Sequence, residues 1–291
     1  MEMKTLTRSV PTDDAALLHA IAQRGRVFVR LPADADWLKA SAGAAGDTVP
    51  LERRLNEMVR RGSLASVGKH RWVVLPPGAS TIEQAAPLKT LLAAKFDGRA
   101  DWYLGYLTAL ADHALTDIDP EDVYVGIRGA RLPAEQHLGA RRLIVVQHTR
   151  DDDWRGVDRE RDGRVFTYRS DVERTLLDTL DQPKRCGPPE VWVRAWERAM
   201  REERANPVRL TDYAEQRSDA VQARLAFWLR ETGHVRQARR VMRALGGALT
   251  GRTLLDASRA FGDGPWRRDR ETGVVVNLPE RAIDGWLEYG K

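Results

Sequence analysis

A short segment, residues 51–61, combines arginine, asparagine and glutamate side chains, the types that read base edges in DNA. Arginine pairs with guanine, asparagine with adenine and glutamate with cytosine in the major groove. If the segment is a helix, with about 100° between successive residues, Arg53 and Arg60 lie opposite its apolar side chains and face the bases. Arg54 and Arg61 then lie to one side, where they would meet phosphates. The apolar side chains are Leu51, Leu55, Met58 and Val59.

A second basic group follows this helix, in a predicted hairpin whose strands are Leu64–Val67 and Arg71–Leu75. Residues 49–72 contain six basic and two acidic residues, so this segment holds a net +4 while the whole chain has +5. Such a concentration of charge favours contact with the phosphates of double-stranded DNA, although a solvated helix face is the alternative. The predicted DNA contacts are Arg53, Arg54, Asn56, Arg60, Arg61, Lys69, His70 and Arg71.

The elements that must position these residues follow the order of a winged helix-turn-helix. Three helices are predicted, the third with Thr48 as its cap and Gly62 as its stop, and a short strand separates the first two. Pro76–Ser80 reads as a linker, because Pro-Pro-Gly interrupts regular structure. We therefore predict a DNA-binding domain over residues 1–78 and a larger domain over 79–291. The predicted elements before the third helix are Thr12–Arg24, Val27–Val29 and Asp34–Ala42.

The sequence pattern of residues 79–291 predicts a domain in which a small β-sheet packs against helices. The predicted fold class of the whole chain is therefore α+β. The predicted strands are Asp122–Ile127, Leu143–Gln147, Val165–Tyr168 and Val274–Asn277. The predicted helices are Gln84–Phe96, Trp102–Ala114, Asp171–Asp181, Pro189–Arg204, Asp219–Thr232 and Val235–Leu245.

Few residues elsewhere suit catalysis or metal binding. His148 ends a β-like run just before Asp151-Asp152-Asp153, and such a group could bind Mg²⁺, although a solvated loop is the more common role. Cys186 is the one cysteine and has no histidine near it in the sequence. Gly246–Thr253 mimics a phosphate-binding loop, but it follows a helix and has Arg252 where lysine is needed. We therefore predict no enzyme activity, no metal and no cofactor.

Composition excludes several classes of protein. The chain has 291 residues, of which 42% are hydrophobic and 31% charged, and this is a globular composition. Its longest apolar runs, such as Leu143–Val146, are far shorter than the roughly 20 residues of a membrane span. No signal peptide is visible, and a single cysteine excludes an intramolecular disulfide. These features predict a soluble, cytoplasmic protein without a membrane partner.

One motif resembles a known family. The segment Ser170–Pro183, which contains Arg-Thr-Leu-Leu-Asp-Thr-Leu-Asp and is followed by Cys186-Gly187, looks like the central motif of the AbiEi antitoxins of type IV toxin–antitoxin systems. Arg224–Gly233 is similar to a second family feature, and Leu55–Val74 resembles the family's winged helix. Two departures are a longer Gly/Ala segment after residue 42, and Cys186-Gly187 where the family usually has Gly-Gly.

The resemblance implies two activities. The N-terminal domain would repress its own operon by binding inverted repeats in the promoter. The C-terminal domain would counteract a separately encoded nucleotidyltransferase toxin, without the need for a stable complex. Two alternatives remain from the residues alone: a winged-helix regulator that senses a ligand, and an enzyme that modifies nucleic acid at Asp151–Asp153 or His148. A toxin gene beside this one would favour the antitoxin.

Overall fold

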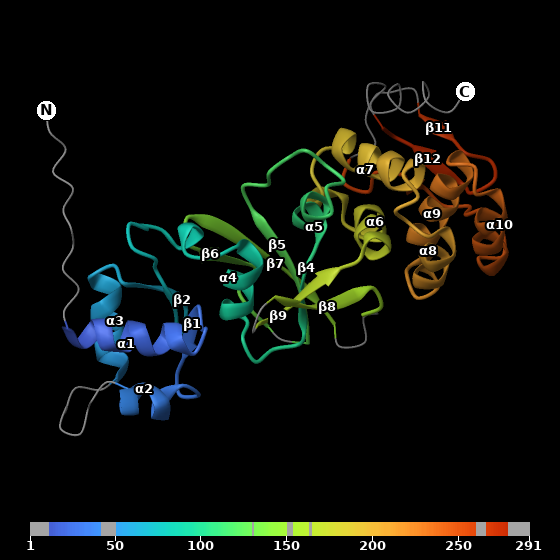
Figure 1. Ribbon diagram of the computed structural model, residues 1–291. Helices are drawn as coiled ribbons and strands as arrows, with labels where there is room; N and C mark the ends of the chain where they lie inside the picture. The colour runs from blue at the N-terminus through green and yellow to red at the C-terminus, as the bar shows by residue number, and fades with distance from the viewer. Residues whose placement is uncertain are drawn as a thin grey trace, which may run out of the picture. The chain divides into compact units, whose positions relative to one another are not determined.

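The computed structural model describes residues 12–41, 51–129, 131–149, 154–162, 165–259 and 266–278. The chain divides into two compact units (Figure 1). The first unit comprises Met1–Arg99, His137–Arg141 and Glu160–Thr167, and the second comprises Ala100–Gln136, Arg142–Arg159 and Tyr168–Lys291. In the described part of the chain, no helix combines the length and the apolar character that crossing a membrane requires.

The first unit begins with three helices and a three-stranded sheet in the predicted order. The sheet has the strand order β1-β3-β2, and both pairings are antiparallel, with Phe28 opposite Val73 and Leu64 opposite Val74. Apolar side chains from all three helices and the sheet form one core, which includes Leu17, Leu38 and Leu55. Thr48, the predicted cap of the third helix, lies outside the described residues. The elements are α1 (Thr12–Gln23), β1 (Phe28–Arg30), α2 (Ala35–Ser41), α3 (Leu51–Arg60), β2 (Leu64–Gly68) and β3 (Arg71–Val74).

The first unit extends beyond the predicted boundary at residue 78. The helix predicted over Gln84–Phe96 forms instead as a 3-10 turn, η1 (Ile82–Gln84), and a separate helix, α4 (Leu88–Lys95), because Pro87 interrupts the two. Helix α4 packs against β2 and β3. The compact unit therefore continues to Arg99, past the division predicted between residues 78 and 79.

This packing gives a prediction about fragments. A fragment of residues 1–80 lacks Leu91, Leu92 and Phe96, which are almost fully buried in the whole chain. We expect it to melt at a lower temperature than a fragment of residues 1–99, since burial of each large apolar side chain contributes about 1.5–3 kcal/mol. Thermal melts followed by circular dichroism compare the two. Equal melting temperatures would contradict the assignment of α4 to this unit.

A six-stranded mixed sheet has the strand order β6-β7-β5-β4-β9-β8. Strand β5 pairs in parallel with β7 and antiparallel with β4, and Leu104 of β4 lies opposite Arg169 of β9 in a parallel pairing. The helix predicted over Trp102–Ala114 is wrong in its first turn: residues 102–104 are a strand, and the helix α5 starts at Tyr106 after Gly105. The elements are β4 (Trp102–Leu104), α5 (Tyr106–Asp112), β5 (Val123–Arg128), β6 (Glu135–Leu138), β7 (Arg141–His148), β8 (Val157–Asp162) and β9 (Val165–Ser170).

Residues 171–245 of the second unit are mostly helical and enclose a tryptophan-rich core. Trp196 and Trp228 stack with ring centroids 5.8 Å apart, and Trp192 meets Trp228 edge to face. A small sheet with the order β10-β12-β11 follows the helices, so the α+β class is confirmed. The elements are α6 (Val172–Asp181), η2 (Pro183–Arg185), α7 (Pro189–Arg201), α8 (Pro207–Ala214), α9 (Asp219–Glu231), α10 (Val235–Ala244), β10 (Thr253–Leu254), β11 (Arg267–Arg268) and β12 (Val274–Val276).

Candidate functional site

Helix α3 has one buried and one exposed side, as its residue spacing predicts. Leu55 and Met58 are fully buried, whereas the side chains of Arg53 and Arg60 are 68% and 73% exposed. A helix side that faces water and carries two arginines can enter a groove of DNA without first breaking contacts with the core. The structure therefore places the two predicted base-reading arginines where a duplex can reach them.

Glu57 lies between these two arginines and pairs with both. Arg53 Nε is 3.3 Å from Glu57 Oε1, and Arg60 Nη2 is 3.9 Å from the same oxygen. Exposed ion pairs of this kind contribute about 0.2–1 kcal/mol. The guanidinium groups can therefore exchange this carboxylate for a base or a phosphate at a small cost. In this structure Glu57 holds both side chains along the helix surface.

Two predicted phosphate contacts are occupied within the protein. Arg54 is only 9% exposed, because its place on the helix is closer to Met58 than to Arg53 or Arg60. Arg61 binds the carboxylate of Asp14 in α1, with its Nε 3.0 Å from Oδ2 and its Nη2 3.2 Å from Oδ1. The prediction that Arg54 and Arg61 meet phosphates is therefore not supported, and the Arg61–Asp14 pair joins α3 to α1.

Asn56 is exposed, but its carbonyl already accepts a hydrogen bond. Trp72 of β3 donates its indole N–H to Asn56 Oδ1 over 3.2 Å. Reading adenine requires both the carbonyl and the amide of asparagine. Asn56 thus links the helix to the hairpin, and Trp72 uses one of the two lone pairs of its carbonyl oxygen.

The hairpin between β2 and β3 offers one exposed cation. Lys69 is exposed at the turn, whereas His70 Nδ1 lies 2.9 Å from Glu52 Oε1. Arg71 turns back toward the protein, where its Nη2 donates to the carbonyl of Asp97 over 3.3 Å. Burial lowers the pKa of the Arg71 guanidinium, and the neighbouring Arg30 lowers it further. Of the predicted hairpin contacts, Lys69 is the one directed to solvent.

A residue that the sequence pattern did not single out supports this hairpin. Lys95, in the last turn of α4, donates its ammonium group to the carbonyl of Val67 in β2, over 3.4 Å, and to that of His137, over 3.1 Å. Burial lowers the pKa of Lys95, and the nearby Arg71 adds to this effect. The lysine is thus used for structure. In the sequence, Lys95 is a basic residue at the end of an amphipathic segment, and this pattern does not predict its contacts with Val67 and His137.

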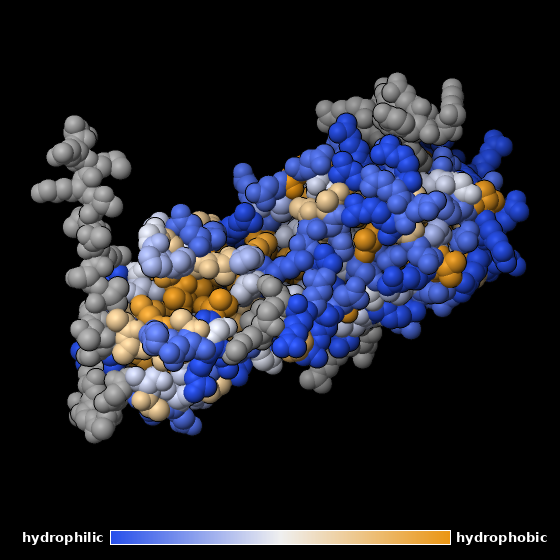
Figure 2. Space-filling view, in the orientation of Figure 1, coloured by the Kyte–Doolittle hydropathy of each residue, from blue (hydrophilic) through white to orange (hydrophobic). Residues whose placement is uncertain are grey.

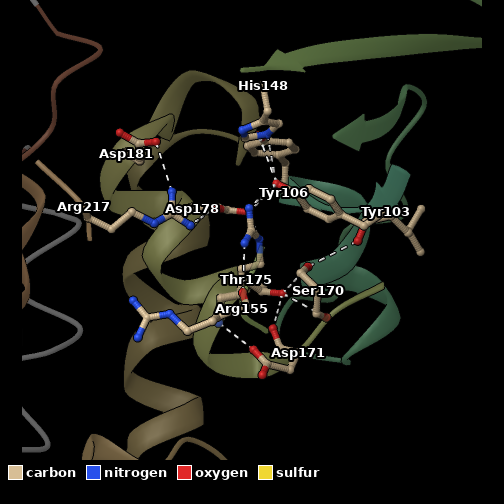
Figure 3. Close-up of polar contacts among 12 residues, drawn as sticks. Tyr103, Tyr106, His148, Arg155, Ser170, Asp171, Thr175, Asp178, Asp181 and Arg217 are labelled. Atoms are coloured by element: carbon tan, nitrogen blue, oxygen red, sulfur yellow. Dashed lines mark hydrogen bonds and ion pairs between the residues drawn. The ribbon is translucent and has the colours of Figure 1, made fainter. Parts of the chain in front are cut away.

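A second polar cluster lies in the second unit and joins β4, α5, β7 and α6 (Figure 3). Tyr103 donates its hydroxyl to Asp178 Oδ2 over 3.2 Å, and Arg217 donates to Asp178 Oδ1 over 3.1 Å. Arg174, which is 1% exposed, lies over the Tyr103 ring at 4.6 Å and donates to its hydroxyl. Tyr103 itself fits against Gly126, where an added Cβ would come within 2.2 Å of its ring.

The polar side chains of this cluster hydrogen-bond to one another. Burial raises the pKa of Tyr103 to about 12, and the charge of Asp178 adds to this effect, so both tyrosines stay protonated hydrogen-bond donors. His148 Nε2 is hydrogen-bonded to the hydroxyls of Tyr106, at 2.9 Å, and Tyr103, at 3.2 Å. That nitrogen is therefore engaged in the protein, which weighs against His148 as a metal ligand. Asp151–Asp153 lie outside the described residues, and no group of metal-ligating side chains occurs within the described ones.

The other two candidates for chemistry are structural. Cys186 is fully buried, and burial raises the pKa of its thiol well above the usual value, so it is a poor nucleophile. The glycines that resemble a phosphate loop end a helix: Gly246 and Gly247 have φ angles of 75° and 123°, and Gly247 N–H donates to the carbonyl of Met242 in α10. Neither segment provides a site.

Comparison with known proteins gives a fold and no family. No family model matches the chain, and neither does any curated protein. Among solved structures, the chain is similar to the crystal structure of the RV2827C protein from Mycobacterium tuberculosis, with a TM-score of 0.71 and 19% sequence identity, covering 96% of both chains. At this identity the likeness shows a common fold.

Proposed function

We propose that this chain is a DNA-binding antitoxin that represses its own operon. The observation that carries the DNA-binding part is the exposed side of α3, where Arg53 and Arg60 project beside a three-stranded antiparallel sheet. The order of three helices and this sheet supports a winged helix-turn-helix, in which α3 is the recognition helix and the β2–β3 hairpin is the wing.

In this proposal α3 enters the major groove. Arg53 and Arg60 leave Glu57 and pair with guanine edges, each through two parallel hydrogen bonds. Lys69 at the wing binds a phosphate, and the Arg61–Asp14 pair holds α3 at a fixed angle to α1. The operator would be an inverted repeat in the promoter, bound as double-stranded DNA.

The antitoxin part is supported by the AbiEi-like segment Ser170–Pro183. Its residues form α6, whose Arg174 and Asp178 belong to the buried network of the second unit. The activity would be to counteract a cognate nucleotidyltransferase toxin encoded beside this gene. Coexpression of the two genes should restore growth that the toxin alone arrests. Growth arrest that persists would contradict this part and leave DNA binding unaffected.

The DNA-binding part is tested by the salt dependence of binding. The wild-type chain is titrated against a duplex from its own promoter and against a scrambled duplex of equal length. Arg53, Arg60 and Lys69 supply three exposed cations. Arg53 and Arg60 in the groove and Lys69 on the backbone together bring three positive charges to the duplex. If these charges neutralise three phosphates, log K falls with log salt concentration with a slope of about −3, since each neutralised phosphate contributes about −0.9. A slope near zero, or equal affinity for both duplexes, would overturn the proposal.

A further inference from the structure

A carboxylate lies between the two arginines on the exposed side of α3. At about 100° per residue, Glu57 lies about 40° from Arg53 and about 60° from Arg60 around the helix. The Glu57 side chain is 33% exposed, so a duplex that meets the two arginines also meets this negative charge. Because DNA phosphates repel a carboxylate, a surface that only had to hold DNA would bind it more tightly without Glu57.

Glu57 contributes little to the fold. In the part of the chain that the structure describes, its ion pairs with Arg53 and Arg60 stay within α3. Both arginines are well exposed, and exposed pairs within one helix contribute little to stability. Asp14, in contrast, is 2% exposed and joins α1 to α3 through Arg61. Stability therefore gives little reason for a carboxylate at position 57.

The two ion pairs of Glu57 cannot by themselves distinguish one DNA sequence from another. Breaking them costs the same free energy with every duplex, because the free protein is the same in each case. Any discrimination must come from the surroundings of the Glu57 carboxylate once DNA is bound.

These surroundings differ between a matching and a non-matching sequence. With a matching sequence, Arg53 and Arg60 pair with guanine edges, and the carboxylate between them faces the bases, where a cytosine amino group can donate to it. With another sequence, the two guanidinium groups turn to phosphates. The carboxylate then lies beside like charges and has no donor. Its negative charge therefore lowers affinity mainly when the sequence is wrong.

We propose that Glu57 is a specificity-determining residue, which weakens the binding of α3 to DNA that lacks the operator sequence. The inference rests on the proposed function, because it takes α3 as the helix that meets DNA. Specificity is a difference between two affinities, so a group that penalises the wrong partner raises it as a new contact to the right partner would. A genome offers about 10⁶–10⁹ competing sites, so a small penalty at each of them matters.

The test introduces E57Q in the full chain and measures binding to the promoter and scrambled duplexes. Glutamine keeps the shape and an acceptor oxygen but removes the charge. For the scrambled duplex, we expect a salt slope steeper by about 0.9 and an affinity about eightfold higher at 0.1 M salt, the effect of one more released counterion. Affinity for the promoter duplex should stay near the wild-type value. The preference for the promoter should therefore fall by about eightfold.

Two control variants separate the position of the charge from its amount. E57D keeps the negative charge on α3 and should keep the wild-type preference and slope. E121Q removes an exposed carboxylate of the second unit, whose visible surface is mostly hydrophilic (Figure 2), and should leave both affinities unchanged. A rise with E121Q as large as that with E57Q would show a bulk charge effect and overturn the inference.

The remaining outcomes distinguish this inference from the proposed function. If the wild-type chain prefers the promoter and E57Q keeps the same preference, the role of Glu57 is overturned and the proposed function stands. An equal rise in affinity for both duplexes would also overturn it, because the charge would then act on all DNA alike. Equal affinity of the wild-type chain for the two duplexes would instead overturn the proposed function. Melting temperatures of the variants check that each one is folded.

Discussion

Asp178→Ala is expected to lower the free energy of unfolding by about 3–5 kcal/mol, because it leaves a buried cation without its partner. Asp178 is 1% exposed and accepts hydrogen bonds from Tyr103 and Arg217, while Arg174 Nε lies 4.0 Å away. The Arg174 side chain is also 1% exposed. Without the Asp178 carboxylate, its positive charge would remain buried in the protein interior, where a charge is poorly solvated. Urea denaturation of the full chain measures the difference.

The neighbouring Asp181→Ala variant is the control for this experiment. Asp181 is 35% exposed and pairs with the same Arg217, whose Nη1 lies 3.4 Å from its Oδ2. An ion pair this open to water contributes about 0.2–1 kcal/mol. We therefore expect a small loss in the control. Equal losses for the two variants would mean that burial of Asp178 is not what makes the network stabilising.

Arg53→Ala is expected to reduce the preference for promoter over scrambled DNA by about 1–3 kcal/mol, the discrimination that a base-reading arginine supplies. This corresponds to a factor of about 5 to 150 in the ratio of the two affinities. Arg53 is 68% exposed, and within the described residues its ion pair is the surface contact with Glu57, so its loss should leave the fold intact. Paired titrations of the variant against the two duplexes measure the ratio.

Arg61→Ala is the informative comparison, because Arg61 lies close to α3 but is bound to the buried carboxylate of Asp14. We expect this variant to melt at a lower temperature while its specificity ratio stays near the wild-type value. If Arg53→Ala leaves the ratio unchanged, α3 is not the reader, and Lys69 at the wing becomes the better candidate.

Residue spacing alone predicted the elements that form the proposed interface. The apolar residues Leu55 and Met58 recur at helical spacing, which predicts α3. A helix with such spacing buries its apolar side, so Arg53 and Arg60 lie on the exposed side. The two β-like runs on either side of Gly68-Lys69-His70 predicted the hairpin that β2 and β3 form. Asp171 as the first residue of a helical segment predicted the start of α6, where its side chain accepts from Arg174 N–H. These are local effects, which the sequence encodes within a few residues.

Only the tertiary structure decided which polar residues remain available to a partner. Asp14 is far from Arg61 in the chain, and Asp97 is far from Arg71, yet each binds a side chain that the sequence predicts as a DNA contact. Trp72 likewise binds Asn56 from a distant segment. Trp102–Leu104 has an apolar run that suits a helix, but it is buried on both sides between two strands and so becomes β4. Burial and charge pairing depend on contacts between distant segments, and these exist only once the chain has folded.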